Sequence, residues 1–256
     1  MLNSRDSRRL RVLIVDDYPV ARRIFITELA PYGVETFEAG DAAEALAIAS
    51  EQNPDVVVLD LFLTGSSGLE VARELRARRG GDRIVIIALS GHAGEEYLEL
   101  ARREGLSTMS LRYANVYGPG QDPLGEAGVV AIFLHKMLHG ADPVINGDGE
   151  QTRDFVYVAD VARANLLALE SAGTGALNVG TGEETSINEL ARILARAAGY
   201  AKPIAHGPAA PGEQRRSSVA PAAARRQLGW SPDVTLEAGL GLTAEWFRDR
   251  SRPNSR

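Results

Sequence analysis

Three carboxylates and a hydroxyl each stand at the end of a short apolar run of this chain. Asp16 and Asp17 follow RVLIV, Asp60 follows DVVVL, and Ser90 follows RIVIIAL. Because the carboxyl ends of parallel strands meet at one edge of a sheet, we expect these side chains to converge. Three carboxylates gathered there repel one another unless a cation lies among them, and an all-oxygen ligand set favours Mg²⁺. Such a site can polarise a phosphoryl group for attack by a carboxylate, with Ser90 donating to its oxygens.

The elements that must position these groups are short apolar runs alternating with amphipathic stretches over residues 11–105. Between the runs lie ARRIFITELAPYG, DAAEALAIASEQN and GLEVARELRARRG, which have helical spacing. Strands alternating with helices predict a doubly wound parallel α/β sheet with helices on both faces. An alternative stays open, in which the aspartates only end strands and cap helices.

The alternation continues with STMSLRY as a fifth strand and then loosens. The sequence predicts a helix in LGEAGVVAIFLHKMLHG, short strands around the Gly-Asp-Gly turn of PVINGDGEQTRDFVYV, a helix in VADVARANLLALESAG and a sixth strand in GALNVG. Ser186 and Glu189 form a capping box that opens a helix ending near Gly199. Further helices are expected after Pro221 and from Leu236.

These elements predict one continuous sheet in the order 2-1-3-4-5-6 with a small C-terminal lobe. The expected divisions are a tail over 1–9, one half over 10–105, a second half over 106–250 and a tail over 251–256. Two separately packed units are the alternative, although no linker composition is visible near residue 105.

Composition excludes several classes of site. The chain has 256 residues, a formal net charge of −6, 45% hydrophobic residues and no cysteine, which excludes disulfides and thiolate metal sites. No apolar run reaches the roughly 18 residues of a membrane span, and the charged start is not a signal peptide, so we expect a cytoplasmic protein without a membrane partner. The negative charge argues against nucleic acid as a partner.

The first half resembles the receiver domain of bacterial response regulators. The resemblance rests on VLIVDD, on VVVLD with Gly68 downstream, and on IIALSG, and it covers about residues 10–113. It implies a flavodoxin-like fold in which Asp60 accepts phosphate from a histidine kinase or a small phosphodonor. It also implies that Asp16, Asp17 and Asp60 hold a metal ion and that Ser90 is the switch hydroxyl.

Two positions depart from the receiver pattern. Thr64 stands where the family usually has proline, and Arg112 stands where the family's phosphate-binding lysine is expected. Arginine keeps the positive charge without the compact geometry of an ammonium group. The resemblance therefore implies that Arg112 is the cation facing the phosphate, with weakened phosphorylation or a lost readout.

The second half resembles nucleotide-sugar epimerases of the UDP-glucose 4-epimerase type, which are extended short-chain dehydrogenases/reductases. The matching stretches are LRYANVYGPGQDP, GDGEQTRDFVYVADVARAN, ALNVGTGEETSINELA and PGEQRRSSVAP. This implies a Rossmann-like end of the fold in which Asn115 and Arg153 contact the diphosphate of a UDP-sugar. Gly120, Ala210 and Ala220 replace two cations and an aspartate of the family pattern. That Asn115 and Arg153 only brace loops remains the alternative.

The cofactor-binding and catalytic motifs of that family do not occur in this sequence. The first strand runs into VDDYPVAR without glycine, so no dinucleotide fingerprint is present. Only Lys136 and Lys202 occur, preceded four positions earlier by Ile132 and Ala198, so no Tyr-x-x-x-Lys pair exists. From this we expect no NAD and no competent epimerase.

The leading interpretation is therefore an engineered chimeric α/β protein with a receiver-type Mg²⁺ and phosphoacceptor site and a residual nucleotide-sugar lobe. Two alternatives stay open. One is a signalling module whose binding of sugar nucleotides is regulated by phosphorylation. The other is an NAD-dependent nucleotide-sugar epimerase.

Overall fold

The computed structural model describes residues 9–89, 109–124, 128–171 and 173–251. The chain divides into two compact units, residues 1–108 and 109–256. Each unit is considered by itself.

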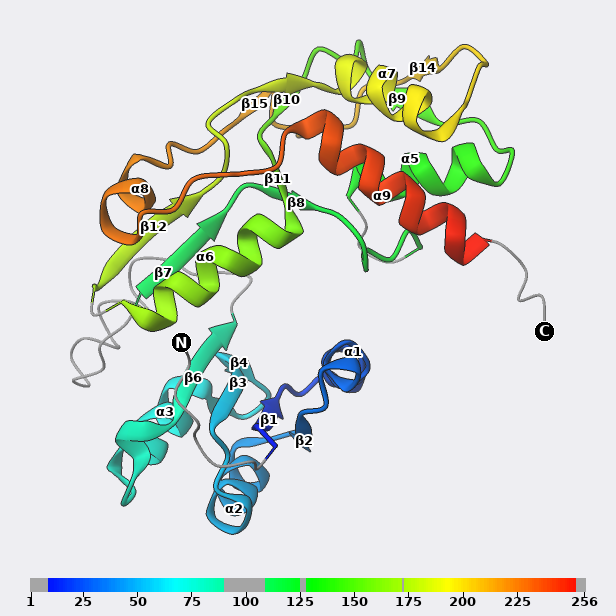
Figure 1. Ribbon diagram of the computed structural model, residues 1–256. Helices are drawn as coiled ribbons and strands as arrows, with labels where there is room; N and C mark the ends of the chain where they lie inside the picture. The colour runs from blue at the N-terminus through cyan, green and yellow to red at the C-terminus, as the bar shows by residue number, and fades with distance from the viewer. Residues whose placement is uncertain (1–8, 90–108, 125–127, 172, 252–256) are drawn as a thin grey trace. The chain divides into compact units, whose positions relative to one another are not determined.

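The first unit has a four-stranded parallel sheet in the order β2-β1-β3-β6 (Figure 1). Its sheet strands are β1 (Arg11–Val15), β2 (Glu35–Ala39), β3 (Val56–Asp60) and β6 (Val85–Leu89). The small antiparallel pair consists of β4 (Phe62–Leu63) and β5 (Ser66–Ser67). The helices are α1 (Pro19–Leu29), α2 (Ala42–Gln52) and α3 (Gly68–Ala77), with 3₁₀ turns η1 (Ala30–Tyr32) and η2 (Gly81–Arg83).

Alternate residues of β1 and β3 enter two separate apolar clusters, so both faces of this sheet are covered. One face packs against α1, and the other packs against α2 and α3 (Figure 1). On the α1 face lie Val12, Ile14 and Val58 with Phe25, Ile26 and Leu29. On the opposite face lie Leu13, Val15, Val57 and Leu59 with Ala45, Ala49, Val71, Ala72 and Leu75. Continuous β-branched strands are what a sheet buried on both sides requires.

The second unit is built from short strands and five helices in its described part. Its strands are β7 (Met109–Tyr113), β8 (Asn115–Tyr117), β9 (Val144–Asn146), β10 (Thr152–Arg153), β11 (Phe155–Tyr157), β12 (Gly175–Val179), β13 (Thr185–Ser186), β14 (Ala205–Gly207) and β15 (Arg216–Ser217). Its helices are α5 (Val129–Leu138), α6 (Val158–Glu170), α7 (Ile187–Ala198), α8 (Ala222–Leu228) and α9 (Leu236–Ser251).

Two apolar clusters hold the second unit together. Helices α5, α7 and α9 contact one another (Figure 1) and bury a cluster that includes Leu134, Leu190 and Leu240. The other cluster surrounds Trp230 and joins α6 and α8 to β7 and β12. The predicted capping box is confirmed at the start of α7, where Ser186 Oγ accepts from the Glu189 N–H at 3.2 Å.

The predicted α/β class with parallel sheets is confirmed, and the single continuous sheet stays a prediction. The first four predicted strands lie in the expected order within the first unit. The predicted fifth and sixth strands, β7 and β12, pair with each other in parallel within the second unit, as the expected order requires. Of the helices that the structure describes, none combines the length and apolar character needed to cross a membrane.

Candidate functional sites

The first candidate site is the acidic trio, defined as Asp16, Asp17 and Asp60. Strands β1 and β3 are neighbours in parallel register, with Val15 opposite Leu59. Their carboxyl ends therefore bring the three carboxylates together, and one oxygen of each lies within 4.8 Å of the others. The side chains are partly buried, and the trio is an all-oxygen set of the kind that Mg²⁺ prefers. The predicted convergence of the aspartates is thus found, and their roles stay a prediction.

Each carboxylate of the trio accepts a hydrogen bond from nearby chain. Asp16 Oδ1 accepts from the Tyr18 N–H at 2.8 Å, and Asp60 Oδ1 accepts from the Phe62 N–H at 3.0 Å. Asp17 Oδ2 accepts from the Thr64 N–H at 3.1 Å and also from the Thr64 hydroxyl. Thr64, identified from the sequence only as a departure from proline, is therefore a direct partner of the trio. Nothing in the sequence pattern pointed to that contact.

The electrostatics of the trio favour a cation. Burial raises the pKa of the Asp16 carboxyl above its ordinary value, and repulsion from Asp60 and Asp17 adds to that rise. The Tyr18 N–H and the Arg22 guanidinium act in the opposite direction. Repulsion among the three carboxylates is the condition that a bound cation relieves.

Gly68 fixes the loop that carries Asp60. A Cβ at this position would lie 2.2 Å from the Asp60 carbonyl oxygen and 2.8 Å from Leu61 Cα, so the backbone can approach only because glycine stands there. The Gly68 N–H donates to the Leu61 carbonyl at 3.1 Å. The other predicted receiver residues are not joined to the trio here: Ser90 lies outside the described residues, and Arg112 lies on β7 of the second unit.

The second candidate site is a pocket of about 570 Å³ in the second unit. Its walls come from β8, the loop before α5, α5 itself, β9, β10 and β11. Both residues predicted to contact a sugar nucleotide line it, and among its charged residues are Lys136, Arg153 and Glu213. The apolar part of the lining includes Val130, Phe133 and Ile145. An apolar pocket with a few polar groups is the usual form of a small-molecule site.

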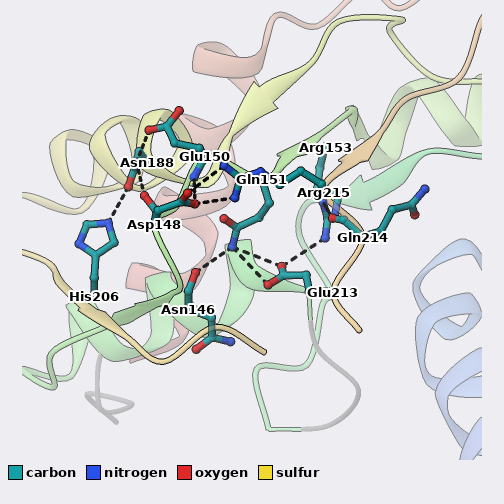
Figure 2. A network of polar contacts seen from close by, with 10 residues as sticks. All are labelled: Asn146, Asp148, Glu150, Gln151, Arg153, Asn188, His206, Glu213, Gln214 and Arg215. Atoms are coloured by element: carbon teal, nitrogen blue, oxygen red, sulfur yellow. Dashed lines mark hydrogen bonds and ion pairs between the residues drawn. The ribbon is translucent and has the colours of Figure 1, made fainter. Parts of the chain in front are cut away.

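Arg153 is held by its own chain within this pocket (Figure 2). Its Nη1 donates to the carbonyls of Thr152 at 2.8 Å and Gln214 at 2.7 Å, and its Nη2 donates to Glu213 Oε1 at 3.2 Å. Gln151, only 5% exposed, donates from Nε2 to the Asn146 carbonyl at 3.0 Å and to Glu213 Oε1 at 3.3 Å. Glu213, which sequence reasoning did not identify, is the common partner of both side chains.

Asn115 is tied to the strand beside it. Its backbone N–H and its Nδ2 both donate to the Asp154 carbonyl, at 2.8 and 3.1 Å. The Asp154 carboxylate is fully buried and accepts from the Thr181 N–H and hydroxyl at 2.9 and 2.6 Å and from the Gly182 N–H at 3.0 Å. Loop bracing by Asn115 is thus observed, and its contact with a ligand stays a prediction.

A polar network supports the Gly-Asp-Gly turn that leads into the pocket (Figure 2). Arg215 donates to both oxygens of Asp148, at 2.7 and 2.8 Å, and these bonds lower the pKa of Asp148 to about 2. Asn188 Nδ2 donates to the Asp148 carbonyl at 2.9 Å and to Glu150 Oε1 at 2.7 Å, and its Oδ1 lies 2.9 Å from His206 Nε2. This network fixes the segments on either side of Arg153.

The two halves of the chain match two protein families. Residues 12–109 match the response regulator receiver domain family, and residues 88–180 match the NAD dependent epimerase/dehydratase family. The two resemblances identified from the sequence are confirmed.

Curated relatives and solved structures give a consistent result for the second family. The chain is 45% identical over 165 residues to a putative UDP-glucose 4-epimerase of Methanocaldococcus jannaschii, a match that covers 64% of this chain and 53% of that protein. It is 46% identical over 162 residues to the UDP-glucose 4-epimerase of Mycolicibacterium smegmatis, a match that covers 62% of this chain and 52% of that protein. The chain thus spans about half the length of these relatives. A Thermotoga maritima UDP-glucose 4-epimerase structure with UDP-glucose is 31% identical with a TM-score of 0.76, over 95% of this chain and 100% of that one. A Thermus thermophilus UDP-glucose 4-epimerase in complex with NAD is 28% identical with a TM-score of 0.71, over 93% and 99%.

These similarities contradict two expectations. The interpretation as an engineered, catalytically silent chimera is wrong, because the relatives and solved neighbours are UDP-glucose 4-epimerases and favour the epimerase alternative. The expectation that NAD has no part is also wrong, because the matched family is NAD dependent and a solved neighbour is a complex with NAD. The missing glycine turn and Tyr-x-x-x-Lys pair are local features, whereas the match to these relatives extends over 162–165 residues.

Proposed function

Because the chain joins a response regulator receiver domain to the C-terminal part of a nucleotide-sugar epimerase of the NAD dependent epimerase/dehydratase family, we propose that it acts on nucleotide sugars as an epimerase. The substrate class is a UDP-sugar, as in the Thermotoga epimerase structure with UDP-glucose. The observation that supports this most directly is the pocket that gathers Asn115, Lys136 and Arg153 in one cavity.

In this proposal each wall of the pocket has a distinct task. Arg153 and Lys136 face the diphosphate, because a guanidinium and an ammonium group both stabilise phosphate charge. The apolar side chains of Val130, Phe133 and Ile145 cover the nucleoside and exclude water. Glu213 orients Arg153 through its 3.2 Å contact.

NAD supplies hydride transfer when it is bound in this family. In related folds its pyrophosphate lies on a glycine-rich turn after the first strand. Here the turn after β1 carries Asp16 and Asp17, whose carboxylates lie within 4.8 Å of Asp60 and would repel a pyrophosphate. The residues of this turn therefore do not fit the pyrophosphate of NAD.

The test is calorimetric titration of the full chain with UDP-glucose, with and without added NAD, together with NMR detection of UDP-galactose. We expect binding in the micromolar to millimolar range and conversion to UDP-galactose. NAD released from the denatured protein is quantified in parallel. Absence of both binding and conversion would overturn the proposal.

A pair of variants separates ligand binding by Arg153 from loop bracing. Arg153→Gln should weaken UDP-glucose binding by about tenfold or more, because a charge-assisted hydrogen bond contributes roughly 1.5–3 kcal/mol. Arg192→Gln is the matched control, since Arg192 pairs with Glu189 on the exposed face of α7. If Arg153→Gln lowers the melting temperature but leaves UDP-glucose affinity unchanged, Arg153 only braces the loops.

The acidic trio favours a second function in the same chain. We propose that Asp60 accepts a phosphoryl group from a histidine kinase or a small phosphodonor, with Mg²⁺ held by Asp16, Asp17 and Asp60. In that transfer an Asp60 oxygen forms the new bond to phosphorus, and the bond to the donor's leaving group breaks, with its electron pair leaving on that group. The cation would neutralise charge on the phosphoryl oxygens.

The second function has its own test. Mg²⁺ titration monitored by NMR should shift amides near Asp17 and Asp60, and beryllofluoride should then bind only when Mg²⁺ is present. Asp60→Asn should abolish the beryllofluoride response. An unchanged spectrum on addition of Mg²⁺ would remove this function without affecting the epimerase proposal.

A further inference from the structure

Gln121 lines the pocket from the loop between β8 and α5. Its Oε1 is the one buried side-chain nitrogen or oxygen atom, among the residues that the structure describes, without a hydrogen-bond partner. Buried polar atoms are almost always paired, because an unpaired one loses its hydration without compensation. An orphaned acceptor in a pocket wall therefore points to a donor supplied from outside the chain.

The surroundings of Gln121 are shaped to hold its amide. Gly128, which precedes α5, also lines the pocket, and a Cβ built on it would lie only 2.8 Å from Gln121 Nε2. A side chain at position 128 would thus displace the amide. The glycine leaves room for Gln121 beside the first turn of α5.

Two other amide side chains of the pocket use their nitrogens for hydrogen bonds within the chain. Gln151 Nε2 donates to the Asn146 carbonyl and to Glu213, and Asn115 Nδ2 donates to the Asp154 carbonyl. The guanidinium of Arg153 donates to two carbonyls and to Glu213. Among the amide oxygens that line the pocket, Gln121 Oε1 is distinguished by being both buried and without a hydrogen-bond partner.

Because Gln121 Oε1 is an acceptor, only a part of the ligand that carries a hydrogen-bond donor can pair with it. Ionised phosphates have only acceptor oxygens, so the diphosphate of a sugar nucleotide cannot satisfy Gln121 Oε1. Hydroxyl groups of the ribose or the hexose, and the ring N–H of a pyrimidine, are donors. The matching group is therefore in the nucleoside or the hexose.

We propose that Gln121 is a specificity residue that accepts a hydrogen bond from an O–H or N–H donor of the bound sugar nucleotide. This assignment rests on the proposed nucleotide-sugar function. It predicts two effects of removing the amide. The complex with the ligand becomes weaker. The free protein is not destabilised, because it loses only an acceptor that had no partner.

The experiment compares the unchanged protein with Gln121→Met, which keeps the length of the side chain and removes the amide. Gln227→Met makes the same change on the exposed face of α8 and is the matched control. Dissociation constants for UDP-glucose, UDP and uridine are measured by calorimetry, and the melting temperature is measured without ligand.

We expect Gln121→Met to weaken UDP-glucose binding about tenfold, which corresponds to about 1.4 kcal/mol, with an unchanged or higher melting temperature. If Gln121→Met loses affinity equally for all three ligands, the donor lies in the nucleoside. If it loses affinity for UDP-glucose alone, the donor lies in the hexose. Unchanged UDP-glucose affinity, or a melting temperature lowered below that of Gln227→Met, overturns the assignment alone. Failure of the unchanged protein to bind any of the three overturns both the assignment and the proposed function.

Discussion

Arg153 Nη2 lies 3.2 Å from Glu213 Oε1, and both residues line the same pocket. The exposed fractions of the two side chains are only 17% and 29%, so solvent screens this ion pair incompletely. A diphosphate entering the pocket therefore meets a guanidinium whose charge is already partly balanced. Under the proposed function, Glu213 should therefore weaken the attraction of the pocket for a diphosphate.

Replacing Glu213 with glutamine should tighten UDP binding. Glu213→Gln keeps an acceptor for Gln151 and removes the charge that opposes the diphosphate, so we expect an affinity gain of roughly fivefold, or about 1 kcal/mol. Calorimetry with UDP at low and high salt measures it, and the gain should shrink as salt rises. Uridine, which has no phosphate, is the control ligand. Weaker UDP binding would mean that the Glu213 carboxylate itself contacts the ligand.

Restoring a cation at position 120 should also tighten diphosphate binding. Gly120 has φ +93°, and a Cβ there would meet no atom within 4 Å, so a side chain fits in space but strains the backbone. Gly120→Ala has this strain without the charge and is the matched control for Gly120→Arg. We expect both variants to lose about 1–3 kcal/mol of folding stability. Only the arginine variant should bind UDP about tenfold more tightly, and equal affinity in the two would show that position 120 does not reach the phosphates.

Thr64 should oppose metal binding through its two bonds to Asp17. Oδ2 of Asp17 accepts from both the N–H and the hydroxyl of Thr64, which leaves this oxygen poorly available to a cation. Thr64→Val removes the hydroxyl bond and should raise Mg²⁺ affinity by roughly fivefold, or about 1 kcal/mol. The control is Thr64→Ser, which keeps the hydroxyl. Mg²⁺ titration by NMR measures both, and lower affinity in Thr64→Val would mean that Thr64 positions Asp17 for the metal.

The ion pair between Asp148 and Arg215 should give the second unit a specific pH dependence. The pKa of the Asp148 carboxyl, about 2, lies below its ordinary value of 3.8. The ion pair therefore stabilises the folded state fully above about pH 4, and this stabilisation is lost as the pH falls toward 2. Asp148→Asn should therefore lower the melting temperature at pH 7, with a difference that narrows below pH 4. Arg215→Gln should behave alike, and the double variant should add little. A difference that is constant from pH 7 to pH 3 would contradict this assignment.

The sequence predicted the secondary structure and the acidic trio well, because both depend on local patterns. The β-branched runs of β1 and β3 required burial on both faces, and the register of parallel strands then brought Asp16 and Asp60 to one edge. The capping box at Ser186 is likewise a short-range signal. These patterns can be recognised in one sequence because they depend on residues that are close together in the chain.

Contacts between distant segments could not be predicted in this way. Glu213 meets Arg153 across 60 positions, and Thr64 meets Asp17 across 47. No spacing rule connects such pairs, since loop geometry decides them. The pairing of β7 with β12, by contrast, agrees with the predicted neighbours five and six, because strand order in a parallel α/β sheet follows from the alternation of strands and helices.

The fully buried carboxylate of Asp154 has a consequence for how the second unit melts. It accepts from Thr181 and Gly182, and the Val219 N–H lies 3.4 Å from its Oδ2, so one side chain joins the strand region at 154 to two later segments. Separating either segment from Asp154 would deprive its buried carboxylate of hydrogen-bond donors, which would cost several kcal/mol of folding free energy. Fraying at this point is therefore suppressed, and heating should destroy the cavity in the same all-or-none transition as the surrounding helices.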